Sequence, residues 1–372
     1  MTSSERLDAV ISGTVPDRVP LAPLLDHWAA IHSGISVYDL MTDPDKRIRA
    51  ILKTASDFKW DMTFLADTAN ETLLRIGVAA RLKMPGVDLP ANCAHQFEET
   101  GFMQVSDYAL LETQGVVPFF LAIVGRIYPE MTMERALADL ARVTEEIKEH
   151  GRLLRQSGIE PAVGFVIPGC SFEYFSLARG ISEGLLDLRR HPETMRKAGK
   201  RYCADMLAMA ISAIVQNGIQ RVFVGLSRSS PVFVSTKHFE TIILPEIEYI
   251  VNGFVNAGIT PVLHCDTDWT KFLPYFQKFP AGKCILELDG FTDIKAAKEI
   301  LGKRMAIMGD VPSTLTANGT KDEVLDYCRN LIKTVGVGGG FILSTGCSIP
   351  VNAKEENILA LTEAVEEWGW YQ

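Results

Sequence analysis

The sequence predicts a closed (β/α)8 barrel, and two features of the chain carry this prediction. From residue 221 onwards, short apolar runs alternate regularly with amphipathic stretches, a pattern typical of parallel strands joined by helices. Over the whole chain eight such runs can be counted, each followed by helix, and this number favours a barrel over a doubly wound open sheet. No linker, low-complexity segment or short-period repeat interrupts the 372 residues, so one domain covering 1–372 is expected.

The expected elements follow in order along the chain. The strands are 19–25, 61–66, 162–167, 221–226, 259–266, 283–288, 304–308 and 341–345. The helices are 5–12, 45–58, 134–157, most of 172–217, 240–256, 270–279, 293–301, 321–335 and 354–368. Residues 71–128 fit no strand–helix unit, so we expect an insertion after the second strand, with a hairpin that joins 96–98 to 102–104.

Composition and charge exclude several classes of protein. Hydrophobic residues make up 47% of the chain and charged residues 22%, as in ordinary globular enzymes. The formal net charge is −9 without a block of like charges, so neither nucleic acid nor membrane is an expected partner. The polar residues 1–8 do not resemble a signal peptide, and the seven cysteines lack framework spacing. Reduced thiols and a cytoplasmic location are therefore expected.

The run 259–266 carries the most informative polar residues. Alternate side chains of a strand share a face, so His264 and Asp266 are expected on one face and Cys265 on the other. A distant strand, 341–345, runs into Cys347. Strand ends with these side chains could form a three-ligand zinc site with an open position. The spacing alone favours His264 and Cys347 as packed rim residues over a metal site. Cys347 as a nucleophile with His264 as its base is a further alternative, which no family signature around Cys347 supports.

Other strand ends supply further candidates, because the active sites of such barrels lie at the C-terminal ends of the strands. The catalytic candidates are His27, Asp67 and Tyr174. The candidates for substrate binding are Asp26, Trp28, Glu173, Arg228 and Asp310. Each is equally well explained as a structural residue at a barrel rim. A phosphate-binding P-loop, a GxSxG elbow and an HExxH motif are all absent from the sequence.

With these strand ends placed, the sequence resembles the uroporphyrinogen decarboxylase superfamily over nearly its whole length. The resemblance rests on four stretches: Glu5-Arg6-Leu7 with Pro16-Asp17-Arg18-Val19-Pro20, Met308-Gly309-Asp310, Gly346-Cys347-Ser348-Ile349-Pro350, and Glu356-Asn357. This superfamily contains decarboxylases and also zinc-dependent, cobalamin-linked methyltransferases. The resemblance therefore implies a (β/α)8 barrel and leaves the branch to be decided.

The decarboxylase branch fits the residues poorly. Decarboxylases have an arginine-rich motif after the first strand that holds porphyrin carboxylates, whereas residues 25–30 of this chain contain no arginine. They also have a Gly-His-Gly turn where this chain has Gly346-Cys347-Ser348. Two features of that branch are retained, Asp67 at the second strand end and Tyr174 six residues after Pro168. Decarboxylation of a porphyrinogen is therefore not the expected reaction.

The methyltransferase branch is more similar to this chain. Its zinc ligands are a His-x-Cys pair at the fifth strand end and a Cys at the eighth. The resemblance places His264, Asp266 and Cys347 at these positions, with a carboxylate in place of one thiolate. A slip of one residue in the strand register would exchange Asp266 for Cys265. The carboxylate makes the metal a harder Lewis acid, which suits the oxygen of an ether better than a thiol.

The resemblance thus implies an enzyme that demethylates a small methoxylated aromatic and passes the methyl group to cob(I)alamin on a separate corrinoid protein. Zinc is the expected metal, cobalamin comes from the partner, and a homodimer is allowed. Three alternatives stay open: a coenzyme M-type thiol methyltransferase, a decarboxylase, and a non-catalytic partner of a corrinoid protein. The identity of the methyl donor does not follow from the sequence.

Overall fold

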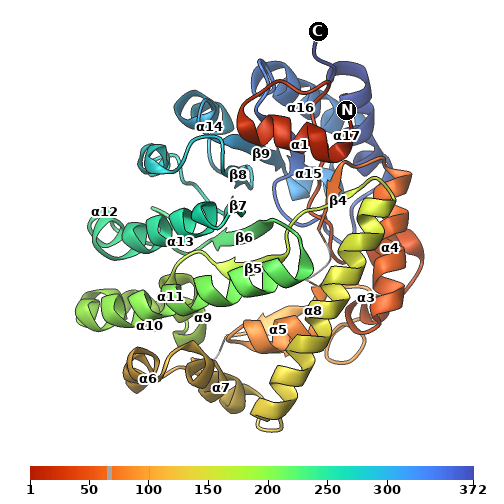
Figure 1. Ribbon diagram of the computed structural model, residues 1–372. Coiled ribbons are helices and arrows are strands. Elements are labelled where there is room, and N and C mark those ends of the chain that lie inside the picture. The colour runs from red at the N-terminus through yellow and green to blue at the C-terminus, as the bar shows by residue number, and fades with distance from the viewer. Residues whose placement is uncertain (65–68, 100) are drawn as a thin grey trace.

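A six-stranded parallel sheet forms the centre of the computed structural model, which describes residues 1–64, 69–99 and 101–372 (Figure 1). The strands lie in the order β10-β9-β8-β7-β6-β5, so each pairs with its neighbour in the sequence. Their bounds are β5 (Phe165–Pro168), β6 (Arg221–Leu226), β7 (Thr260–Cys265), β8 (Ile285–Leu288), β9 (Ala306–Val311) and β10 (Phe341–Thr345). Sequential parallel pairing of this kind requires a crossover between every two strands, as predicted.

Backbone hydrogen bonds continue this sheet into a ring. The segment 19–25 lies beside β10, where the Leu343 amide donates to the Pro20 carbonyl at 2.9 Å, and Leu21 bridges Leu343 in parallel. On its other side the Leu21 carbonyl accepts from the Asp61 amide at 2.9 Å. The next strand, β1 (Met62–Thr63), pairs in parallel with β4 (Glu160–Pro161), which leads along the chain into β5. The ring therefore has eight strand positions.

The interior of this ring is a separate hydrophobic cluster. It receives side chains from all eight strand positions and from α1 (Ser3–Ser12), which covers the end where the strands begin. Its members are Leu7, Val10, Ile11, Ala22, Leu24, Met62, Phe64, Ala162, Val163, Phe223, Val262, Ile285, Ala306, Met308 and Ile342. A filled interior contributed by every strand is the packing of a (β/α)8 barrel, so the predicted fold class is confirmed.

The helices form the outer layer around the strands (Figure 1). They are α2 (Trp28–Ser33), α3 (Val37–Thr42), α4 (Pro44–Asp57), α8 (Met133–Gln156), α9 (Ser171–Arg179), α10 (Ile181–Arg190), α11 (Pro192–Asn217), α12 (Thr236–His238), α13 (Leu244–Asn256), α14 (Ile294–Leu301), α15 (Ser313–Asn318), α16 (Lys321–Thr334) and α17 (Glu355–Trp368), with the π-helical turn η2 (Phe239–Ile243) and the 3₁₀ helix η3 (Leu273–Lys278). A capping box at Thr2 starts α1 two residues before the predicted start at residue 5, and one at Thr320 starts α16 at the predicted residue. None of the helices in the described part of the chain is long and apolar enough to cross a membrane.

Two local predictions differ from the structure. The expected strand 19–25 forms only isolated bridges, because Pro20 and Pro23 have no amide hydrogen to donate to a neighbouring strand. The expected hairpin also has the wrong partner, since β3 (Gln96–Glu98) pairs antiparallel with β2 (Arg81–Lys83) and not with 102–104. The paired residues of β2 and β3 are 13 or more positions apart, so no short turn motif between the strands indicates their pairing.

The elements between β1 and α8 correspond to the predicted insertion, 71–128. They are α5 (Glu71–Gly77), the hairpin β2–β3, α6 (Ser106–Gln114) and α7 (Val116–Ile127). None of these elements adds a strand to the ring of the barrel. That residues 1–372 form one domain with this segment as an insertion stays a prediction.

Candidate metal centre

Strand β7 presents His264 to the inside of the barrel. Val262, two residues earlier, belongs to the interior cluster, and alternate residues of a strand share a face. His264 and Asp266 therefore face inward at the C-terminal end of β7. Cys265 faces the opposite way and is fully buried in the cluster between strands and helices.

Three side chains meet at this point. His264, Asp266 and Cys347 each offer one ligand atom, and these atoms all lie within 4.8 Å of one another. The His264 Nε2 is 3.0 Å from the Asp266 Oδ1, and Cys347, two residues after β10, forms a hydrogen bond with His264. The structure thus brings together the three residues that were predicted as zinc ligands.

Two further polar side chains fix the orientation of this cluster. Glu287 of β8, also inward-facing and fully buried, forms a hydrogen bond with the His264 Nδ1. Ser227, just after β6, donates to the Asp266 Oδ2 at 2.6 Å. Because Nδ1 and Oδ2 are engaged in this way, the His264 Nε2 and the Asp266 Oδ1 remain on the side that faces Cys347.

The charges of the cluster reinforce one another. Burial lowers the pKa of His264, but Glu287, Asp266 and Cys347 outweigh burial and raise that pKa well above its usual range. Burial raises the pKa of Asp266, but the interaction with His264 prevails and lowers it. Burial raises the pKa of Glu287. The site therefore concentrates negative charge around a single imidazole.

The donor set fits a zinc ion. One nitrogen and one carboxylate oxygen from the end of β7 and one sulfur from the end of β10 match a catalytic zinc site, which has three protein ligands and an open position. The hydrogen bond between Glu287 and the second imidazole nitrogen is the usual outer contact of a metal-bound histidine. The second Glu287 oxygen is buried without a partner among the described residues, which leaves it able to accept a further hydrogen bond beside the cluster.

The first strand ends in a hydrogen-bonded chain beside this centre. Asp26 accepts from the Ser348 hydroxyl, next to Cys347, and its Oδ1 lies 3.3 Å from the His27 Nδ1. The His27 Nε2 is in turn 2.9 Å from the Nδ1 of His95, a residue of the β2–β3 connection. Burial, followed by the charge of His27, lowers the pKa of His95 to about 4. Sequence reasoning missed His95, because nothing in the insertion marks it as a rim residue.

Glu173 and Arg228 serve a structural contact and not the metal cluster. The Glu173 carboxylate, half-buried at the start of α9, accepts hydrogen bonds from the Arg228 amide and from both the amide and the hydroxyl of Ser229. Burial raises the pKa of Glu173. The Arg228 guanidinium pairs with Glu99, next to β3. Together these contacts hold the loop after β6, which carries Ser227, and tie the insertion to it.

Three other candidates lie away from the cluster. Tyr174 packs against Phe119 and Tyr202 in the helix layer, because it stands about 100° around α9 from Glu173. The Trp28 indole donates to the Ala353 carbonyl at 3.1 Å, which is a packing contact between α2 and the loop before α17. Asp310 accepts from the Tyr327 hydroxyl of α16 at 3.0 Å, and burial raises its pKa to about 6. Asp67 lies outside the described residues.

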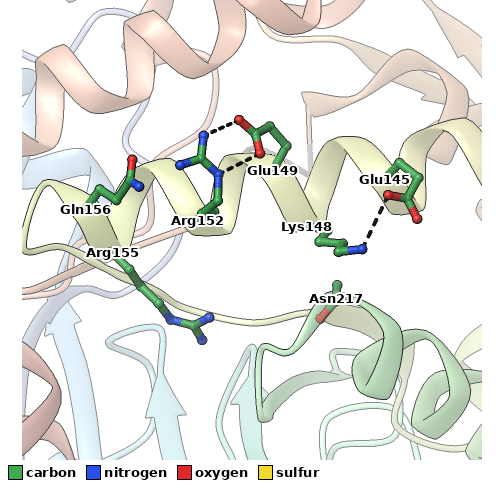
Figure 2. A pocket seen from close by; sticks show the side chains of 7 residues that line it. All are labelled: Glu145, Lys148, Glu149, Arg152, Arg155, Gln156 and Asn217. Carbon is green, nitrogen blue, oxygen red and sulfur yellow. Dashed lines mark hydrogen bonds and ion pairs between the residues drawn. The ribbon is translucent and has the colours of Figure 1, made fainter.

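Two cavities among the described residues are lined by none of the three donors of the cluster. One, of about 660 Å³, is a groove between α8 and the end of α11 (Figure 2). Its side chains pair with one another, as in Arg152–Glu149 and Lys148–Glu145. It lies where α8 leads into β4, near the start of the strands. A second cavity, of about 510 Å³, contains Asp310 and Tyr327.

The fold and the cluster define a class of protein, a (β/α)8 barrel with three potential metal donors at its C-terminal rim. The chain belongs to the uroporphyrinogen decarboxylase (URO-D) family, whose sequence model matches residues 126–368. That range includes all three donors of the cluster. The predicted family is thereby confirmed.

Individual relatives are distant. The chain is 35% identical to a uroporphyrinogen decarboxylase of Trichlorobacter lovleyi over 85 residues, which is 23% of this chain and 24% of that protein. It is 26% identical to the enzyme of Nitrosococcus oceani over 250 residues, 62% of this chain and 64% of the relative. The chain thus matches less than two thirds of the length of these curated relatives.

A solved structure covers the chain more completely. A methyltransferase from Methanosarcina mazei superposes with a TM-score of 0.74 over 99% of both chains, at 18% sequence identity. This likeness shows a shared fold along the whole chain, including the insertion and the barrel.

Proposed function

We propose that the protein is a zinc-dependent methyltransferase of the URO-D superfamily that takes a methyl group from a methoxylated aromatic and passes it to the cob(I)alamin of a corrinoid protein. The cluster of His264, Asp266 and Cys347 supports this proposal most directly. These residues would hold the ion, which when bound acts as a Lewis acid toward the ether oxygen of the donor. The shared fold with a methyltransferase is in agreement.

The side chains around the cluster have defined tasks in this reaction. Glu287 keeps the His264 Nδ1 occupied, so that Nε2 is the ligand atom, and Ser227 leaves one oxygen of Asp266 free for the ion. The carbon–oxygen bond of the donor breaks with its electron pair on oxygen, which then takes up a proton. We assign the supply of this proton to His27, which Asp26 links to Ser348 beside the cluster.

The charge of the rim argues against a porphyrinogen substrate. Asp26 and Asp266 lie at the strand ends, whereas the Arg228 guanidinium is occupied by Glu99. A substrate with several carboxylates would meet negative charge here without free cations to balance it. A carboxylate ligand also makes the site harder than the thiolate-rich sites that suit thiols. Transfer from an aryl ether is therefore favoured over decarboxylation and over transfer to a thiol.

The remaining parts of the proposal follow from the chemistry. Cob(I)alamin is a strong reductant that survives only in a reducing compartment, and the seven cysteines are all free, so we assign the protein to the cytoplasm. The corrinoid protein is the macromolecular partner. A homodimer is compatible with the proposal and is not required by it.

Elemental analysis and a transfer assay test the proposal together. The purified protein is expected to contain about one zinc per chain, and Cys347→Ala is expected to lose it. With methoxybenzene as donor, the wild type should convert reduced cobalamin to its methylated form, which absorbance follows, and Cys347→Ala should not. Equal zinc contents in the two proteins, or transfer that does not depend on zinc, would contradict the proposal.

A further inference from the structure

Val166 is unusual among the side chains that face the inside of the barrel. Its position on β5 is aligned with Phe223 of β6, a member of the interior cluster, so Val166 also faces inward. The interior cluster is buried, yet 38% of Val166 is exposed. A strand residue that faces inward and is exposed borders an open space within the barrel mouth.

Gly225 lies at the next inward position of β6, between Pro168 of β5 and His264 of β7. Its φ is not in the left-handed region, so its backbone does not require glycine. A Cβ built there would meet, among described atoms, a ring carbon of Phe223 at 3.7 Å and the Ile167 carbonyl oxygen at 3.8 Å, which are ordinary contacts. Neither conformation nor packing explains the missing side chain, so glycine here leaves room directly beside His264.

The walls of this recess are apolar except on one side. Phe223 forms the lower wall, with its ring tilted by 32° against the His264 imidazole at a centroid distance of 4.9 Å. Val166 forms the side wall on β5, and Gly225 opens the space above Phe223. His264 and Asp266 form the fourth side, so a group in the recess would lie next to the metal cluster.

We propose that Val166, Phe223 and Gly225 form the site that holds the aromatic ring of the methyl donor beside the metal cluster. This inference rests on the proposed function and specifies its substrate class as a flat, uncharged aromatic ether. An aromatic ring fits because Phe223 offers a surface for offset or edge contacts and Val166 an aliphatic one. A negatively charged ring substituent directed at Asp266 would be repelled.

Filling the recess tests this site without touching a metal ligand. The probe is methoxybenzene, whose binding to the zinc-loaded protein is measured by calorimetry without cobalamin. Gly225→Val and Val166→Phe are each expected to weaken binding about tenfold or more, and Gly225→Ala about threefold, because the added carbons occupy the space of the ring. Zinc content and melting temperature should stay near those of the wild type.

Gly125→Ala is the matched control, since Gly125 on α7 also has open space around its Cβ and no left-handed φ. It should bind methoxybenzene like the wild type. Unchanged binding in Gly225→Val and Val166→Phe would overturn the inference. So would a loss of zinc from Gly225→Ala in parallel with its loss of binding, because the residue would then act through the metal site.

The failure of this inference can be told apart from failure of the proposed function. If the wild type binds zinc and methylates reduced cobalamin from methoxybenzene, and Gly225→Val and Val166→Phe bind methoxybenzene as tightly as the wild type, the aromatic recess is wrong and the proposed function stands. If methoxybenzene binds in the recess and no donor yields methylcobalamin, the proposed function is wrong. In both cases the effects of Gly225→Ala and Gly225→Val are measured as changes in methoxybenzene binding, without the methyl-transfer assay.

Discussion

Asp266 and Glu173 are carboxylates on either side of the loop after β6, and they illustrate two uses of an acid at a barrel rim. Asp266 accepts one hydrogen bond from Ser227, keeps its other oxygen toward His264 and is 29% exposed in its side chain. Glu173, also half-buried, accepts from three donors of residues 228 and 229. The difference shows that a polar residue at a strand end becomes a candidate ligand only when part of its hydrogen-bonding capacity stays free.

Removing Glu173 should therefore affect stability and not metal binding. Glu173→Ala leaves the Arg228 amide and both Ser229 donors without their acceptor, and is expected to cost about 3–4 kcal/mol of unfolding free energy. Its zinc content should match that of the wild type. Denaturant unfolding and elemental analysis measure both quantities. A Glu173→Ala protein that is as stable as the wild type but lacks zinc would contradict the assignment of Glu173 to stability and of Asp266 to metal binding.

Most of the barrel could be predicted from the sequence because its second half is regular. The predicted strands 221–226 and 341–345 coincide with β6 and β10, since each is an apolar run between clear turn signals. The alternation of side chains along a strand also predicted that His264 and Cys265 point to opposite faces of β7. Predictions failed where pairing is non-local, as in the hairpin of β2 and β3, and where proline removes ladder donors, as in 19–25.

The candidate site could be predicted less completely. Its ligands on β7 follow from the alternation of side chains along a strand. The residues that support these ligands depend on contacts between strands, which a single sequence does not show. Glu287 has the same parity in its strand as Ile285 of the interior cluster, and this signal could have identified it as inward-facing. Tyr174, predicted as catalytic, lies on α9 among aromatic side chains of the helix layer, since neighbouring side chains of a helix point in different directions, and its catalytic role stays a prediction.

Glu246 extends the comparison to a carboxylate of the helix layer. It is buried between α9, α11 and α13, where it accepts from the Ser171 amide at 2.8 Å and contacts Cys203. Burial raises its pKa from 4.5 to about 7. Between these values the folded protein keeps a proton that the unfolded chain releases, so stability falls as the pH rises from 4.5 to 7.

The corresponding variant is Glu246→Gln, which should remove this part of the pH dependence. The difference in unfolding free energy between wild type and variant is expected to change by about 3 kcal/mol from pH 4.5 to pH 7 and to be constant above that range. Denaturant unfolding at several pH values measures it. Parallel curves for the two proteins would mean that Glu246 is charged throughout.

Glu287 is the counterpart of Glu173 within the metal centre, since it also supports a neighbouring residue, which here is a ligand. Glu287→Gln should weaken zinc binding by about 10–100-fold, because the amide orients the His264 imidazole without its negative charge. Competition with a chelator measures the affinity. Glu366→Gln, which replaces an exposed carboxylate, is the control and should bind zinc like the wild type. Unchanged affinity in Glu287→Gln would remove Glu287 from the site.

The central claim is that the metal ligands are His264 and Asp266, which share the inward face at the end of β7, together with Cys347. The neighbours Cys265 and Asp266 give its most direct test. The measurement is the zinc content of Asp266→Ala and Cys265→Ser, purified side by side. We predict that Asp266→Ala loses zinc, whereas Cys265→Ser keeps about one zinc per chain and loses about 1 kcal/mol of stability. Loss of zinc from Cys265→Ser with retention in Asp266→Ala would contradict this account and replace the carboxylate with a thiolate.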